Sequence, residues 1–173
     1  FKDFVKDPLA MAETYRRPLP SEPFKATMQG TLFHNWVEQR FGIVSSQDQI
    51  DALLDLETWD EVEPVSVAIE ELKQNFEASR WADRKPLEVE TEIQVTIGQN
   101  TFICKLDAVF DATEDSDLAG FEIEIVDWKT GVAPKTEDEI AERALQLALY
   151  RMAYSKRTGI PEEKISVCLY YVS

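Results

Sequence analysis

Three successive segments of alternating polarity between residues 87 and 129 constrain the fold more than any other feature of this chain. Residues 87–97, 101–111 and 121–129 alternate apolar and polar side chains, as half-buried β-strands do. The short connections between them predict an antiparallel meander. A helical pattern over 137–157 then leads to an apolar strand at 165–172, which such a crossover places parallel to its neighbour. The sequence therefore predicts an α/β fold with a mixed central β-sheet: a three-strand meander plus one strand after a helical crossover.

The segments before the sheet predict helices that flank it. Apolar residues recur at helical spacing over 27–41 and again over 65–82. Shorter helices are expected at 4–15 and within 45–64, and the proline-rich stretch RRPLPSEP at 16–23 predicts an extended connector. We expect a single domain over residues 1–173, with a lead-in segment at 1–27 and a core at 28–173.

Composition narrows the class of protein. The chain is 44% hydrophobic and 29% charged, which is typical of soluble globular proteins. No apolar run approaches the roughly 18 residues of a membrane span, and no signal-peptide pattern is present, so we expect a cytoplasmic protein. The chain begins with Phe1 rather than Met, so we expect it to be cut from something longer. Cys104 and Cys168 are interpreted as buried hydrophobes, with a disulfide as the alternative.

The net charge of −15 argues against tight binding to nucleic acid. Proteins hold DNA largely through lysine and arginine contacts to phosphates, and this chain has an excess of carboxylates instead. Carboxylates are good ligands for hard divalent cations. The charge therefore favours a cation site and requires any nucleic-acid hypothesis to explain the repulsion.

The stretch FEIEIVDWKTG at 121–131 supplies the first candidate for such a site. Alternation places Asp127 and Lys129 on the same strand face as the apolar residues that precede them. On the preceding strand, the alternation of residues 102–110 places Asp107 on the face that includes Ile103 and Val109. In a suitable register the two aspartates meet, and a divalent cation such as Mg²⁺ would relieve their repulsion. Lys129 would then stabilise negative charge on a phosphate, and the alternative is a structural Asp–Lys pair at a strand end.

Other side chains extend this candidate site. His34, the only histidine, lies on the first long helix and is a candidate metal ligand or a structural imidazole. Gln146 and Tyr150 lie one turn apart on the last long helix, where they could orient a phosphate or a water, or simply lie at the edge of the core. Glu90 is a further candidate carboxylate, unless Glu88, Glu90 and Glu92 form a solvated strand face.

The order of these segments resembles a known family. Along the chain stand GTLFH at 30–34, a glutamate-bearing strand, CKLDAVF at 104–110, IVDWKTG at 125–131 and QLALY at 146–150. This set resembles the RecB-type nuclease domain of the PD-(D/E)XK superfamily, whose motifs run GTxxH, E, GxxD, DxK and QxxxY. The resemblance covers roughly residues 28–155, and RRPLPSEP resembles the entry to such domains at the C-terminus of UvrD-like helicases.

The resemblance implies a restriction-endonuclease-like fold and a DNA nuclease that depends on Mg²⁺ or Mn²⁺. It implies an exonuclease of DNA repair and recombination, within a bacterial, cytoplasmic, DNA-associated helicase–nuclease. An attached ATP-dependent helicase would supply single strands of DNA, so the domain would not need a high affinity of its own. A helicase–nuclease partner subunit is also implied.

Position by position, the resemblance implies a role for each candidate. The metal ligands would be His34, Asp107, Asp127 and the backbone carbonyl of Trp128. Lys129 would be the catalytic lysine, supported by Gln146, Tyr150 and, more weakly, Glu90.

The chain also departs from the family pattern. Cys104 stands where the family has glycine, and two cysteines exclude the four-cysteine iron–sulfur cluster of some relatives. One alternative is a catalytically silent nuclease fold that guides DNA or docks a protein, and another is an acidic interaction domain with accidental motifs.

Overall fold

The computed structural model describes residues 25–42 and 62–173. The helices are α3 (Lys25–Arg40), α5 (Val62–Glu77) and α6 (Glu137–Thr158), with short 3₁₀ helices η2 (Ser116–Leu118) and η3 (Glu162–Lys164). The strands are β1 (Glu88–Ile97), β2 (Asn100–Asp111), β3 (Ile123–Lys129) and β4 (Ile165–Tyr171). The helices expected at 4–15 and within 45–64, and the connector at 16–23, lie outside the described residues. In the described part of the chain, no helix combines the length and apolar character that crossing a membrane requires.

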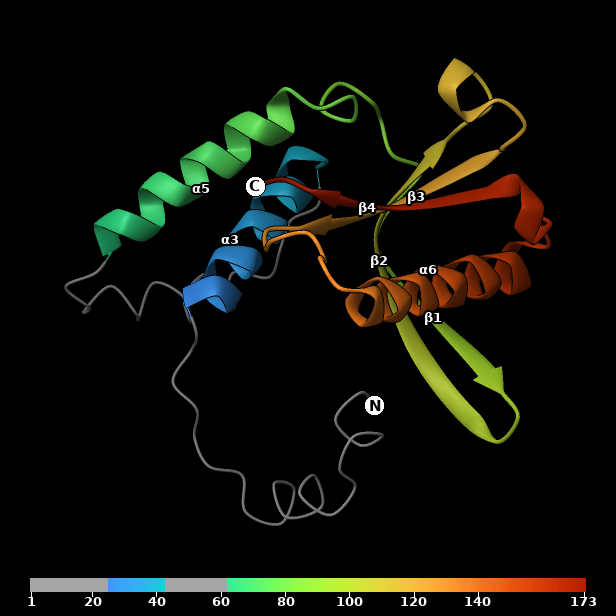
Figure 1. Ribbon diagram of the computed structural model, residues 1–173. Helices are drawn as coiled ribbons and strands as arrows, with labels where there is room; N and C mark the ends of the chain where they lie inside the picture. The colour runs from blue at the N-terminus through green and yellow to red at the C-terminus, as the bar shows by residue number, and fades with distance from the viewer. Residues whose placement is uncertain (1–24, 43–61) are drawn as a thin grey trace, which may run out of the picture.

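The four strands form one mixed sheet in the order β1-β2-β3-β4, as Figure 1 shows. The pairs β1–β2 and β2–β3 are antiparallel. The crossover through α6 makes β4 parallel to β3. The predicted fold class is therefore confirmed, including the parallel addition of the last strand.

Helices cover both faces of the sheet (Figure 1). Against one face, α3 and α5 enclose an aromatic core whose largest members are Phe33, Phe76, Trp81, Phe110 and Trp128. Against the other face, α6 contributes Tyr150, Ala153 and Tyr154 to an aliphatic core with the strands. A capping box at Thr136 and Glu139 starts α6, and Gly159 in the left-handed conformation ends it.

The alternation expected along β2 is wrong for half of the strand. Cys104 and Leu106 pack in the core beneath α6, whereas Ala108 and Phe110 pack in the core beneath α3 and α5. The change of face coincides with Glu90 on β1, whose φ of 51° is the only positive value at a non-glycine residue in the described chain. In Figure 1 the outer half of the β1–β2 hairpin turns away from the line of β3 and β4. A bend of this kind re-aims side chains that a flat strand would place on one face.

The expected end of the second long helix is also wrong, because α5 ends at Glu77 and residues 78–83 form turns. These turns carry side chains to the fully buried Glu124 of β3. Trp81 Nε1 donates to this carboxylate at 3.1 Å and Arg84 at 2.8 Å, and Arg80 forms a further ion pair with it. A buried carboxylate needs several donors of this kind.

Candidate active site

The candidate site lies where the β2–β3 pairing ends. The last paired residues there are Ala108 and Val126, so Asp107 stands directly beyond the ladder. Its Oδ2 atom accepts a hydrogen bond of 2.7 Å from the backbone N–H of Trp128. The Trp128 indole is buried in the core beneath α3 and α5. This backbone contact holds the Asp107 carboxylate beside the end of β3.

Helix α3 brings His34 to this carboxylate. The His34 Nδ1 atom lies 3.6 Å from Asp107 Oδ2 and 3.9 Å from Glu90 Oε1. One turn earlier, a Cβ on Gly30 would stand only 3.3 Å from Thr130 Oγ1, in the loop after β3. Glycine therefore allows α3 to pass close to this loop, and the close approach places the imidazole over the end of the sheet.

Glu90 completes a compact group. Side-chain ligand atoms of His34, Glu90 and Asp107 all lie within 4.8 Å of one another. Glu90 has a left-handed backbone, and its carboxylate lies in this group rather than on a solvated strand face. Its second oxygen forms an ion pair with Lys105, whose side chain is 57% exposed. Of the glutamates that could have formed a solvated strand face, Glu92 is exposed, whereas Glu90 lies in the site.

Asp127 is held from the opposite face of the sheet by α6. Tyr150 donates its hydroxyl to Asp127 Oδ1 at 3.3 Å, and Gln146 Nε2 lies 3.5 Å from the same oxygen. Gln146 also donates to the Tyr150 hydroxyl at 2.8 Å. The other carboxylate oxygen of Asp127 forms an ion pair with Lys129. Gln146 and Tyr150 therefore orient Asp127, and Asp127 in turn positions Lys129.

Burial and mutual charge govern the protonation of the group. Burial raises the pKa of Asp107 to about 7, the Asp127 carboxylate adds to the rise, and His34 opposes it. Burial lowers the pKa of His34, but Glu90, Asp107 and Asp127 outweigh this and leave it above its ordinary value. At 3.9 Å, Glu90 acts on the imidazole as a charge rather than as a hydrogen-bond acceptor. A bound cation would favour the charged form of Asp107 against the effects of burial and of the Asp127 charge, which raise its pKa.

The donor set fits a divalent cation. One imidazole nitrogen and carboxylate oxygens suit Mn²⁺ and, with more oxygen ligands, Mg²⁺. Glu90 Oε2 and Asp127 Oδ2 are covered and have no directional hydrogen bond among the described residues, although each contacts a lysine ammonium. Carboxylate oxygens of this kind can contact a metal ion as well as a lysine.

The structure brings the predicted side chains together, with one difference in their grouping. The compact group contains Glu90 in place of Asp127, whose charge nevertheless raises the pKa of both His34 and Asp107. The roles of Asp127 and the Trp128 carbonyl as metal ligands stay predictions. Lys105 was not predicted as part of the site, because its contact with Glu90 depends on the register of β1 against β2, which the sequence does not specify.

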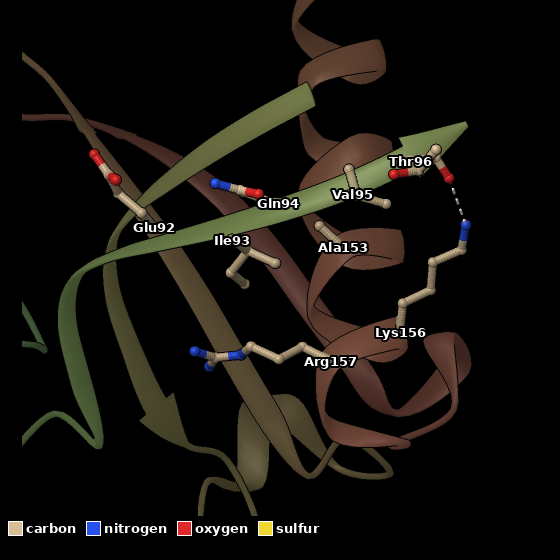
Figure 2. Close-up of a pocket in the computed structure, with 8 residues that line it drawn as sticks. All are labelled: Glu92, Ile93, Gln94, Val95, Thr96, Ala153, Lys156 and Arg157. Atoms are coloured by element: carbon tan, nitrogen blue, oxygen red, sulfur yellow. Dashed lines mark hydrogen bonds between the residues drawn. The ribbon is translucent and has the colours of Figure 1, made fainter. Parts of the chain in front are cut away.

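A pocket of about 330 Å³ lies away from this group, between the outer half of β1 and the C-terminal part of α6 (Figure 2). Lys156 donates to the Thr96 carbonyl across it. Arg157 pairs with Glu88 and stacks on Tyr154. The cationic side chains of this pocket are therefore already engaged within the fold.

The mixed sheet with helices on both faces defines the restriction-endonuclease-like class of fold. A family model of the PD-(D/E)XK nuclease superfamily matches residues 9–173, and the chain belongs to this superfamily. Its members are generally nucleases that use divalent metals. Among curated proteins, no relative matched the chain.

Proposed function

We propose that this chain is a divalent-metal-dependent DNA nuclease domain that hydrolyses phosphodiester bonds. The observation that carries the proposal is the convergence of His34, Glu90 and Asp107 within 4.8 Å, next to the Asp127–Lys129 pair. Separate segments contribute these groups, namely α3, β1, β2 and β3. A structural Asp–Lys pair would not need an imidazole and two further carboxylates beside it.

Each residue has a distinct task in this proposal. His34, Glu90, Asp107 and Asp127 would hold the cation, which we propose to be Mg²⁺ or Mn²⁺. When bound, the cation would supply Lewis-acid polarisation of the phosphate and lower the pKa of a water molecule. The Lys129 ammonium would stabilise the negative charge that develops on the phosphate oxygens. Tyr150 and Gln146 would keep Asp127, and through it Lys129, in position.

We further propose that the domain works as an exonuclease in DNA repair and recombination, attached to an ATP-dependent helicase. The net charge of −15 supports a tethered arrangement, since the domain repels DNA at long range. A motor that delivers single strands raises their effective concentration at the site without requiring a basic surface. The family motifs and the proline-rich lead-in support the RecB-type assignment.

A cleavage assay tests the proposal. End-labelled single-stranded DNA is incubated with wild type, Asp127→Ala or Lys129→Ala in Mg²⁺ or Mn²⁺. We expect both variants to cleave at least a hundredfold more slowly, as removal of a preorganised charge at a reacting phosphate costs about 3 kcal/mol or more. Lys164→Ala is the matched control, because it removes an exposed lysine paired with Glu122 at 3.9 Å. Equal rates in all four proteins would refute the assignment.

A second candidate is a silent module that retains the fold but does not cut. The intact set of His34, Asp107, Asp127 and Lys129 favours activity over this alternative, because a silent site has no use for four buried or half-buried charged groups. The same assay separates the two, since a silent module would bind DNA without shortening it.

A further inference from the structure

Strand β4 places a polar group without a hydrogen-bond partner among the described residues, the Tyr171 hydroxyl, at the edge of the sheet that carries the candidate site. Its parallel register pairs Asp127 with Leu169, Trp128 with Tyr170 and Lys129 with Tyr171. Partners in this register project to the same face, about 4.8 Å apart between neighbouring strands. Tyr171 therefore stands beside Lys129 on the side remote from Asp107, at the carboxyl ends of the two parallel strands. In open α/β sheets this edge is where ligands bind.

The hydroxyl of Tyr171 is covered but has no hydrogen-bond partner among the described residues. A buried hydroxyl left unpaired costs about 1–3 kcal/mol, so its retention next to the site calls for an explanation. Its neighbour Tyr170 faces the other way and packs in the aromatic core, with ring centroids 4.6 Å from Trp81 and 6.0 Å from Trp128. The two adjacent tyrosines thus have different surroundings, and only Tyr171 shares a face with Lys129.

We propose that Tyr171 is a further substrate-binding residue. Its hydroxyl is covered in the free protein; when a DNA strand binds at Lys129, the side chain turns outward and donates this hydroxyl to a phosphate oxygen of the strand. This inference rests on the proposed nuclease function and extends it to β4. An ammonium and a phenol hydroxyl that extend from paired positions of neighbouring strands offer donors to one phosphate or to two successive ones. The bound strand would then run across the end of the sheet, from the His34–Glu90–Asp107 group past Lys129 to Tyr171.

Tyr171→Phe, compared with Tyr170→Phe, tests this proposal because each change removes one hydroxyl and keeps the ring. Three quantities are measured for both variants and wild type: single-turnover cleavage of single-stranded DNA in Mn²⁺, Mn²⁺ affinity by calorimetry, and the urea midpoint of unfolding in EDTA. We expect Tyr171→Phe to cleave about tenfold more slowly with unchanged Mn²⁺ affinity. Its unfolding midpoint should equal or exceed that of wild type, because an unpaired buried hydroxyl is removed.

Either of two results would overturn the proposal. One is wild-type cleavage by Tyr171→Phe, and the other is a lower unfolding midpoint together with reduced Mn²⁺ affinity, which would mark a purely structural role. If wild type and Asp127→Ala cleave equally, the nuclease function fails on its own. The Tyr171 contact is then decided by the anisotropy of a fluorescent single-stranded oligonucleotide in Ca²⁺. Weaker binding by Tyr171→Phe than by Tyr170→Phe supports the contact, and equal binding overturns it.

Discussion

At the scale of single residues, the buried Asp107 carboxylate makes the most specific prediction. Its pKa of about 7 in the fold exceeds the ordinary value of 3.8, so the folded protein holds this proton more tightly than the unfolded chain. Without metal, the wild type therefore loses stability as the pH rises from about 4 to about 7, by at most about 4 kcal/mol. Asp107→Asn keeps an acceptor for the Trp128 N–H and removes this loss.

The measurement is the free energy of unfolding in urea and EDTA at pH 5 and pH 8. We expect the stability of Asp107→Asn relative to wild type to be greater at pH 8 than at pH 5. Loss of the Asp107 charge also removes a cause of the raised His34 pKa, which changes stability in the same direction. The control is Asp117→Asn, which changes an exposed aspartate in η2. Its free energy of unfolding should differ from that of wild type by the same amount at pH 5 and at pH 8. If the free energies of unfolding of Asp107→Asn and wild type differ equally at both pH values, the pKa of Asp107 is not raised by its surroundings.

Tyr150 allows a second prediction at this scale. Tyr150→Phe removes the hydroxyl that donates to Asp127 and accepts from Gln146. We expect cleavage to fall by about 10- to 100-fold, the usual loss when a group that orients a metal-site residue is removed. Tyr154→Phe is the control. Tyr154 lies on the same helix as Tyr150, but its hydroxyl donates to Glu88 of β1, at 3.1 Å, rather than to Asp127. Similar cleavage by the two variants would argue that Tyr150 has no special role.

At the scale of secondary-structure elements, the left-handed residue Glu90 in β1 makes a testable prediction. A left-handed backbone is strained for any residue with a Cβ, by about 1–2 kcal/mol. In EDTA, Glu90→Gly should therefore be more stable than Glu90→Ala by about 1 kcal/mol. The order should reverse two residues later, where Glu92→Gly should be less stable than Glu92→Ala because glycine weakens a regular strand. Urea denaturation of the four variants checks this, and the same order at both positions would exclude strain at Glu90.

The sequence does not predict the bend at Glu90 or the change of face that accompanies it in β2. Alternation and helical spacing identify the sheet, its crossover and the helices, because these depend on local patterns of burial. The change of face between Leu106 and Ala108 coincides with one left-handed residue in the partner strand, Glu90, and such a residue leaves no periodic signal. The end of α5 at Glu77 is likewise not marked in the helical spacing, which continues to Ala82. The sequence predicts the candidate ligands through the order of their motifs along the chain, which resembles that of a known family, and not through their geometry.

At the scale of the whole molecule, the excess of carboxylates shapes how DNA can be bound. A chain with a net charge of −15 has more carboxylates than cations to offer a DNA strand. Among the described residues, Lys129 and Lys105 form ion pairs with carboxylates of the candidate site. If about two phosphate contacts carry the binding, affinity should fall roughly 25-fold between 20 mM and 200 mM NaCl. Anisotropy of a labelled single strand in Ca²⁺ measures this slope. Affinity that does not change with salt would mean that phosphate contacts are not what holds the strand.

The central claim is that the acids and the imidazole surround one divalent ion, and a calorimetric titration with Mn²⁺ tests it most directly. We expect one ion per chain in wild type, no detectable binding in Asp107→Ala and weakened binding in His34→Ala. Asp117→Ala, which removes an exposed carboxylate at the opposite end of the sheet, should titrate like wild type. A titration curve for Asp107→Ala that matches wild type would contradict the metal site and the nuclease function that depends on it.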